Sequence, residues 1–234
     1  MTKTPHSKLP TPNLILALDV DSFKRAKYFV DKLYPKIKIF KVGIHLFTAC
    51  GPKITEYIRK KGGEIFLDLK FFDIPNTVAN AVRQAVGLRV KMLTLHILGD
   101  EEMLKAALQA AKQEAARLKI KRPLLIGVTV LTSKEAKFRD VYVLAKLGLE
   151  SGLDGVVCSA REARLLRKTI KRKFLIVTPG IRPAGANKND QKRVVTAQEA
   201  IRSGSNFLVV GRPIIEAKDP LAVIKAIVDI DQGG

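Results

Sequence analysis

LILALDVDS, residues 14 to 22, is the stretch that decides the fold of this chain. Its first five residues are apolar, as in a buried strand, and Asp19 and Asp21 follow at once. A doubly wound open sheet of the dinucleotide-binding kind would place a glycine-rich G-x-G-x-x-G turn directly after this first strand. Because an acidic turn stands there instead, the stretch favours an α/β fold of the closed (β/α)8 type, the TIM barrel.

The same unit of strand and helix recurs along the rest of the sequence. Apolar runs alternate with amphipathic stretches at a spacing of about 29 residues, which is normal for eight barrel units. Several runs are apolar throughout, as parallel strands covered on both faces are. We expect strands over residues 14–19, 37–42, 64–70, 91–96, 123–131, 154–159, 174–178 and 206–211. The clearest helical stretches are 22–33, 76–88, 101–118 and 219–230.

The composition fits one globular domain. The chain has 234 residues, 47% of them hydrophobic, which is enough for a single barrel. We expect a loose N-terminal tail over residues 1–12, since this polar, proline-containing segment lacks the apolar centre of a secretory signal, and a catalytic barrel over 13–234. No apolar run reaches the roughly 18 residues of a membrane span. Cys50 and Cys158 form no C-x-x-C pair, so a reduced, cytoplasmic protein is predicted.

The charge balance is strongly basic. Lysine and arginine number 42 against 22 acids, which gives a formal net charge of +20. Basic residues cluster in 119–122 and 161–173, but tryptophan is absent and few aromatic residues lie among these clusters. A platform for stacking bases needs aromatic side chains, so specific nucleic-acid recognition is not predicted. A lysine-rich soluble surface, non-specific attraction of polyanions and a small anionic ligand all remain compatible with the charge.

Charged residues end the first three predicted strands. Side chains alternate across a strand, so Asp68 and Lys70 share one face of the third strand. By the same alternation Asp19 ends one face of the first strand, and Lys41 shares a face of the second with Ile37. Barrel enzymes place their sites at these carboxyl ends. The four charges predict a preorganised catalytic array; the alternative is a set of ions that merely neutralise one another at the barrel mouth.

The loops after strands seven and eight predict a phosphate site. VTPGIRP (177–183) and VVGRPI (209–214) lie where such barrels usually hold phosphate. Gly211 allows close backbone approach, and Arg212 has a fork of donors for phosphate oxygens. The long connection 179–195 resembles a lid, in which Arg182 and Gln191 would close over a ligand. Ordinary turns and a solvent-exposed loop are the alternatives.

Three further positions have weaker predictions. Thr132 and Ser133, after the fifth strand, would either hydrogen-bond a ligand's polar ring or cap the next helix. His96 has no second histidine or cysteine close by in sequence and is interpreted as structural. No metal-ligand pattern is found, so no metal site is predicted.

The chain is similar over essentially its whole length after the tail to the orotidine 5′-monophosphate decarboxylase family. The resemblance depends most on DLKFFDIPNT, in which D-x-K-x-x-D alone is shared with related sugar-phosphate barrels. The chain departs from the family's pattern at two places. Phe72 stands where the family often has histidine, and residues 96–100 replace a segment that in the family usually ends in two glycines. The matching motifs are LALD (16–19), KVG (41–43), DLKFFDIPNT (68–77), VTVLTS (128–133), DGVVCS (154–159), TPGIRP (178–183), Gln-Lys-Arg (191–193) and VVGRPI (209–214).

The resemblance implies a carboxy-lyase that converts orotidine 5′-monophosphate (OMP) to UMP in pyrimidine biosynthesis. It implies no cofactor and a homodimer with shared active sites. Lys70 would protonate C6 of the pyrimidine, with Asp68 beside the substrate carboxylate and Lys41 joining the charged array to the ribose. Asp73 would complete the set from the partner subunit.

The resemblance also implies the residues that bind the substrate. Asp19 would hold the ribose, Thr77 would reach in from the partner, and Gln191 would close from the lid. Thr132 and Ser133 would contact the base. The phosphate would be held by Arg182, Gly211 and Arg212.

Two rival functions remain at this point. A metal-dependent sugar-phosphate decarboxylase or aldolase-like synthase on the same barrel would share D-x-K-x-x-D and the phosphate loops. A nucleic-acid or anion-binding protein whose barrel has lost its chemistry would show salt-sensitive polynucleotide binding and no turnover.

Overall fold

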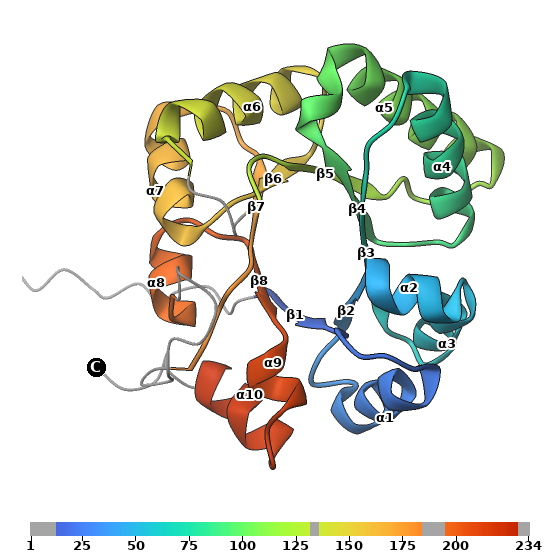
Figure 1. Cartoon of the computed structure of the whole chain (residues 1–234), viewed down its shortest axis with the longest axis vertical. Helices are drawn as coiled ribbons and strands as arrows, with labels where there is room; N and C mark the ends of the chain where they lie inside the picture. Colours follow the sequence, from blue (N-terminus) through green and yellow to red (C-terminus); the bar gives the residue numbers. More distant parts are fainter. Residues whose placement is uncertain (1–12, 132–135, 184–194, 229–234) are drawn as a thin grey trace, which may run out of the picture.

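The computed structural model describes residues 13–131, 136–183 and 195–228 (Figure 1). Within these residues eight parallel strands close into a barrel in sequence order, and helices surround it, as predicted. The predicted tail, Thr132, Ser133 and Gln191 lie outside the described residues. The strands are β1 (Asn13–Ala17), β2 (Ile39–Gly43), β3 (Glu64–Phe71), β4 (Met92–His96), β5 (Leu124–Val128), β6 (Gly155–Val157), β7 (Leu175–Thr178) and β8 (Phe207–Val210).

The four predicted helical stretches are helical in the structure to within one residue at each described end, and further helices occur along the chain. Ser22 caps α1 by accepting from the Arg25 amide, and Ser159 forms a capping box with Glu162 at α7. The helical elements are α1 (Phe23–Leu33), α2 (Ile44–Cys50), α3 (Lys53–Lys60), α4 (Pro75–Gly87), η1 (Ile97–Gly99), α5 (Asp100–Arg117), α6 (Phe138–Glu150), α7 (Ala160–Thr169), α8 (Ala197–Arg202), α9 (Arg212–Ile215) and α10 (Pro220–Val228).

The apolar residues form two cores separated by the sheet. The larger core lies between the strands and the helices, and it includes Phe40, Leu67 and the buried thiol of Cys158. The smaller core fills the barrel interior with Ile15, Ile39, Ala17, Phe66, Met92, Ile126, Val177, Phe207 and Val209. Side chains therefore fill the barrel interior, as is usual in this fold.

Each predicted strand differs from the observed one by a residue or more at its ends, most of all β5, which ends at Val128 and not at residue 131. Two of these differences concern the predicted site. β1 stops at Ala17, so Asp19 lies in the connection beyond the strand. β2 begins at Ile39, and Ile37, which we expected on the inner face with Lys41, packs in the outer core instead. The reason is that Ile37 precedes the paired segment, where strict alternation of side chains does not apply.

β3 is irregular near its end. Leu67 pairs with Leu93 of β4, but Phe71 pairs with Leu95, so β3 has extra residues between these pairs. Lys70 lies in this bulge with φ at 51°, in the left-handed region that only a few non-glycine residues adopt. Bulges of this kind redirect a side chain, often beside an active site. Among the described residues, no helix has the length and apolar character needed to cross a membrane.

Candidate active site

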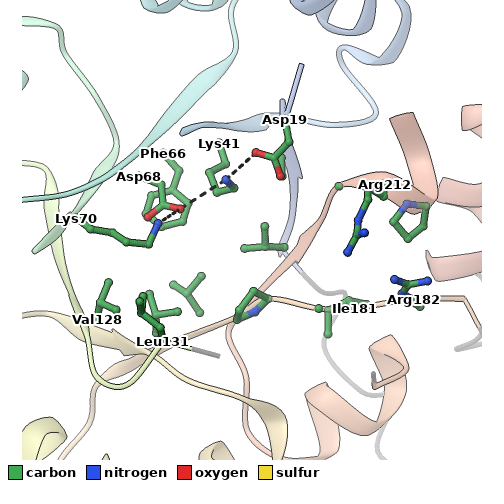
Figure 2. Close-up of a pocket in the computed structure, with 18 of the residues that line it drawn as sticks. Asp19, Lys41, Phe66, Asp68, Lys70, Val128, Leu131, Ile181, Arg182 and Arg212 are labelled. Atoms are coloured by element: carbon green, nitrogen blue, oxygen red, sulfur yellow. Dashed lines mark hydrogen bonds and ion pairs between the residues drawn. The ribbon is translucent and has the colours of Figure 1, made fainter. Parts of the chain in front are cut away.

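A pocket of about 210 Å³ opens at the carboxyl ends of the barrel strands (Figure 2). It contains the predicted charged residues of the first three strands and the predicted phosphate loops. Its lining residues are Ala17, Asp19, Lys41, Phe66, Asp68, Lys70, Val128, Val130, Leu131, Val157, Val177, Pro179, Gly180, Ile181, Arg182, Val209, Gly211, Arg212 and Pro213.

The four predicted charges form one continuous chain on one side of the pocket. Lys41 Nζ lies 3.1 Å from Asp19 Oδ1 and 3.5 Å from Asp68 Oδ2. Lys70 Nζ donates to the same Asp68 oxygen at 2.9 Å. Figure 2 shows the resulting order Asp19, Lys41, Asp68, Lys70 along the pocket wall. Opposite charges therefore alternate, and each lysine is held in position by at least one carboxylate.

Asp68 is the most constrained member of this chain. Its side chain is only 13% exposed, against 55% for Asp19 at the mouth. Burial by itself raises the pKa of Asp68, but the charges of Lys41 and Lys70 and hydrogen bonds from Lys70 and Thr94 outweigh it, so the pKa lies below its usual value. Asp68 is therefore ionised at neutral pH, and a fixed negative charge faces the pocket.

Thr94 contacts the charged chain, although the sequence analysis did not single it out. Its side chain is fully buried in β4, and its hydroxyl donates to Asp68 Oδ1 at 3.0 Å. The Thr94 hydroxyl oxygen in turn accepts from the backbone amide of Lys70 at 2.9 Å. Thr94 thus holds both the Asp68 carboxylate and the bulged backbone of Lys70. The available signal was one hydroxyl residue inside the apolar run KMLTLH.

The absence of a side chain at Gly43 leaves room for the Lys41 ammonium. A Cβ at residue 43 would lie 3.2 Å from Lys41 Nζ and 3.7 Å from Asp19 Oδ1. The first of these separations is tighter than ordinary van der Waals contact. A side chain at residue 43 would therefore push the Lys41 ammonium away from its carboxylate partners.

The two predicted arginines lie together at the other end of the pocket. Figure 2 shows Arg182 and Arg212 remote from Lys70, with the pocket between them. Arg182 is positioned by its backbone amide, which donates to the carbonyl of Val195 at 3.1 Å. A Cβ at Gly211 would approach Ala17 Cβ to 3.3 Å and Asp19 Oδ2 to 3.4 Å, so the absence of a side chain keeps this wall open.

Apolar side chains line the space between the charged chain and the arginines. Phe66, Val128 and Leu131 lie near Lys70 (Figure 2), and Val177 and Val209 also line the pocket. These residues were not among the predicted site residues. Alternate residues of each strand face the barrel interior, and this pattern could have identified the strand residues among them. The sequence analysis used the pattern only to predict the core.

Two predicted residues lie outside this pocket. Asp73 and Thr77 are exposed and follow β3, and the Asp73 carboxylate accepts from the Ile74 amide at 2.7 Å. Neither lines the pocket of its own chain. His96 is partly buried and packs against Phe72 with a ring-centroid separation of 5.6 Å. No group of three metal-ligating side chains gathers within residues 13–131, 136–183 and 195–228.

Comparisons with known proteins agree on one family. The sequence model of the family described as "Orotidine 5′-phosphate decarboxylase / HUMPS family" matches residues 12–227. Orotidine 5′-phosphate decarboxylase of Moorella thermoacetica is 47% identical over 226 residues, covering 92% of this chain and 90% of that protein. The protein of the same name from Syntrophotalea carbinolica is 48% identical over 227 residues, with 92% and 93% covered.

Solved structures show the same likeness. Orotidine 5′-phosphate decarboxylase from Lactobacillus acidophilus superposes with a TM-score of 0.82 at 36% identity, covering 95% of this chain and all of that chain. An uncharacterized conserved protein from Geobacillus kaustophilus superposes with a TM-score of 0.81 at 31% identity, covering 94% of this chain.

Proposed function

The chain belongs to the orotidine 5′-phosphate decarboxylase / HUMPS family, and from that premise we propose that it decarboxylates OMP to UMP without a cofactor. One observation supports this proposal above the others. A single pocket contains an alternating Asp–Lys–Asp–Lys chain at one end and two arginines at the other. These are the charges needed by an anionic, phosphorylated substrate that loses CO2.

The charges at the two ends of the pocket support one orientation of the substrate. Arg182, Arg212 and the bare backbone at Gly211 hold the phosphate, because guanidinium forks match phosphate oxygens. Asp19 and Lys41, at the end of the charged chain opposite to Lys70, hydrogen-bond the ribose. The pyrimidine then lies against the apolar wall, with C6 and its carboxylate toward Asp68 and Lys70.

The lysine charge carries the chemistry. As the bond between C6 and the carboxylate carbon breaks, CO2 leaves as a neutral molecule and the electron pair stays on C6. The Lys70 ammonium lies next to this carbanion, stabilises it and transfers one proton from Nζ to C6. The neutral amine then regains a proton from solvent. A preorganised charge of this kind needs no reorganisation during the reaction.

Asp68 makes the ground state less favourable. Two carboxylates about 4 Å apart repel by roughly 4 kcal/mol at an effective dielectric constant near 20. The substrate carboxylate meets this repulsion on binding and loses it as CO2 departs. Binding of the remote phosphate supplies the free energy that holds the substrate there. The role predicted for Gln191 lies outside the described residues.

The proposed assembly is a homodimer whose subunits complete one another's sites. Asp73 and Thr77 are exposed and lie outside the pocket of their own chain, as residues that serve a partner would. Around them, large apolar side chains stand exposed after the ends of β2, β3 and β4. These are Ile44, Phe72, Ile74 and Leu98, which are 55%, 59%, 67% and 60% exposed. A second subunit covering this apolar rim would bring Asp73 to the neighbouring array.

The remaining proposals concern the base and the setting. Thr132 and Ser133 contact the pyrimidine, a role that lies outside the described residues. The enzyme works in the cytoplasm, in the synthesis of UMP.

An absorbance assay tests the proposal. The purified protein, incubated with OMP and excess chelator, should deplete the orotate chromophore and yield UMP and CO2. Strict dependence on a divalent metal, with turnover of a sugar phosphate, would favour the synthase alternative. Binding of polyanions without any turnover of OMP would favour the non-catalytic alternative.

A further inference from the structure

A set of exposed basic side chains lies on the face of the barrel opposite the active site. They belong to the connections that lead from a helix into β2, β4, β5 or β7, at the amino ends of the strands. We call this set the basic face. It consists of Lys36, Lys38, Arg89, Lys119, Lys121, Lys171 and Lys173, all of them exposed.

The topology brings these residues together although they are distant in sequence. The amino ends of parallel strands meet at one end of a closed barrel, and β2, β3, β4 and β5 are successive neighbours. The connection from α3 into β3 contributes Lys61 to the same end, where the Lys61 ammonium pairs with Asp31 at 2.8 Å. The basic face therefore extends over several adjacent connections rather than converging on one point.

The acids at this end do not neutralise the basic face. Glu64 pairs with Lys91 at 2.6 Å, and Asp154 forms a bidentate pair with Arg122 at 2.8 Å. Each acid thus already has a basic partner outside the set. No ion pair joins a member of the basic face to an acid in the part of the chain that the structure describes.

Two open grooves cross this end of the barrel. One has a volume of about 360 Å³ and is lined by Arg89 and Lys121, and the other has about 680 Å³ and is lined by Lys173. Both grooves are lined in part by Leu124. Three members of the basic face, Arg89, Lys121 and Lys173, therefore border open grooves at this end of the barrel.

We propose that the basic face binds the phosphate backbone of nucleic acid without regard to sequence. Its charges are spread along a surface, as the repeating phosphates of a polymer are, and do not form a pocket for one phosphate. Tyr34 and Phe174, the aromatic residues of these connections, are half-buried and buried, so no stacking platform for bases is present. Contacts to the backbone alone fix no sequence.

The apolar residues argue for nucleic acid over a membrane. Peripheral attachment to a bilayer usually combines basic residues with apolar side chains that enter the lipid. Among the described residues, the large exposed hydrophobic side chains are Tyr28, Ile44, Phe72, Ile74, Leu98 and Val143, and none lies in the connections of the basic face. The partner that fits is charged and hydrated.

Titration of a fluorescein-labelled 30-base-pair duplex of arbitrary sequence, followed by anisotropy, tests the proposal. Affinity should fall at least about 100-fold between 50 and 200 mM salt, as expected when about four phosphates are neutralised. A second duplex of unrelated sequence should bind equally well. UMP at a concentration that saturates the active site should not displace the duplex, because the two sites lie at opposite ends of the barrel.

Matched variants locate the surface. The triple variant Lys119→Glu, Lys121→Glu, Lys173→Glu should lose at least about tenfold in duplex affinity at 50 mM salt while keeping its decarboxylase activity. The control reverses three exposed charges on the outer helices, Lys112→Glu, Arg161→Glu, Arg164→Glu. Its affinity should stay within about twofold of wild type.

The proposal is overturned by an equal loss in both triple variants, since general charge would then explain the binding. It is equally overturned if wild-type protein fails to bind the duplex at 50 mM salt. Tighter binding to phosphatidylserine vesicles than to the duplex would assign the basic face to membranes instead.

Discussion

The ammonium of Lys70 lies 2.9 Å from Asp68 Oδ2, inside a pocket where the Asp68 side chain is almost buried. Lys41 approaches the same oxygen to 3.5 Å, so one carboxylate oxygen is shared between two cations. In the proposed reaction a substrate carboxylate enters beside Asp68, and Lys70 turns from its acidic partner to the developing carbanion.

Replacing Lys70 with alanine removes both the proton donor and the charge that stabilises the carbanion. We expect Lys70→Ala to lose at least about 10⁴-fold in kcat, the scale of a general acid together with an electrostatic contribution. UMP binding, measured by calorimetry, should persist because the phosphate end is unchanged. A near wild-type rate would contradict the role given to Lys70.

Thr94 is expected to act through Asp68 and Lys70 and not on the substrate. Thr94→Val keeps the volume but removes a hydrogen bond that lowers the pKa of Asp68. The pKa of Asp68 should therefore rise, and the acidic limb of the kcat/KM profile should move to higher pH. We expect kcat to fall by about 10- to 100-fold, from the loss of positioning.

Thr94→Ser is the matched control, because serine keeps the hydroxyl. It should restore the pH profile and most of the rate. A Thr94→Val enzyme with an unshifted acidic limb would show that Thr94 serves only packing.

Arg212 is predicted to recognise the phosphate. Arg212→Ala should raise KM for OMP by about 100-fold or more, the loss of a charge-assisted bidentate contact of about 3 kcal/mol. Slow turnover of orotidine, which has no phosphate, should be unchanged. Equal losses for the two substrates would remove the phosphate assignment.

Asp73 is predicted to serve the partner subunit's site. Lys70→Ala and Asp73→Asn homodimers should both be nearly inactive. A hybrid dimer with one subunit of each kind has one complete site if Asp73 acts across the interface, and about half of wild-type activity per dimer is expected. If Asp73 acts within its own subunit, the hybrid has no complete site and remains inactive.

The alternation of apolar runs with amphipathic stretches was sufficient to predict the barrel and the approximate positions of its strands. It also brought Asp19, Lys41, Asp68 and Lys70 to one end, because parallel strands in a closed sheet share a carboxyl edge. The array was predictable because the charged end of each strand could be identified from that strand alone. Closure of the barrel then brings these ends together.

The details that this pattern could not predict depend on contacts between neighbouring strands. The bulge that turns Lys70 into the pocket requires register with β4, where the Thr94 hydroxyl accepts from the Lys70 amide. Alternation within one strand contains no information about such a partner. The roles of Asp73 and Thr77 depend on a second subunit, whose position no single-chain pattern specifies.

The central claim is that Lys70 stabilises a carbanion at C6 and protonates it. Exchange of the C6 hydrogen of bound UMP with solvent deuterium, followed by NMR, tests it most directly, since it forms the same carbanion without CO2. The wild-type enzyme should catalyse this exchange, and Lys70→Ala should bind UMP without catalysing it. Equal exchange rates in the two proteins, or none in the wild type, would contradict the claim.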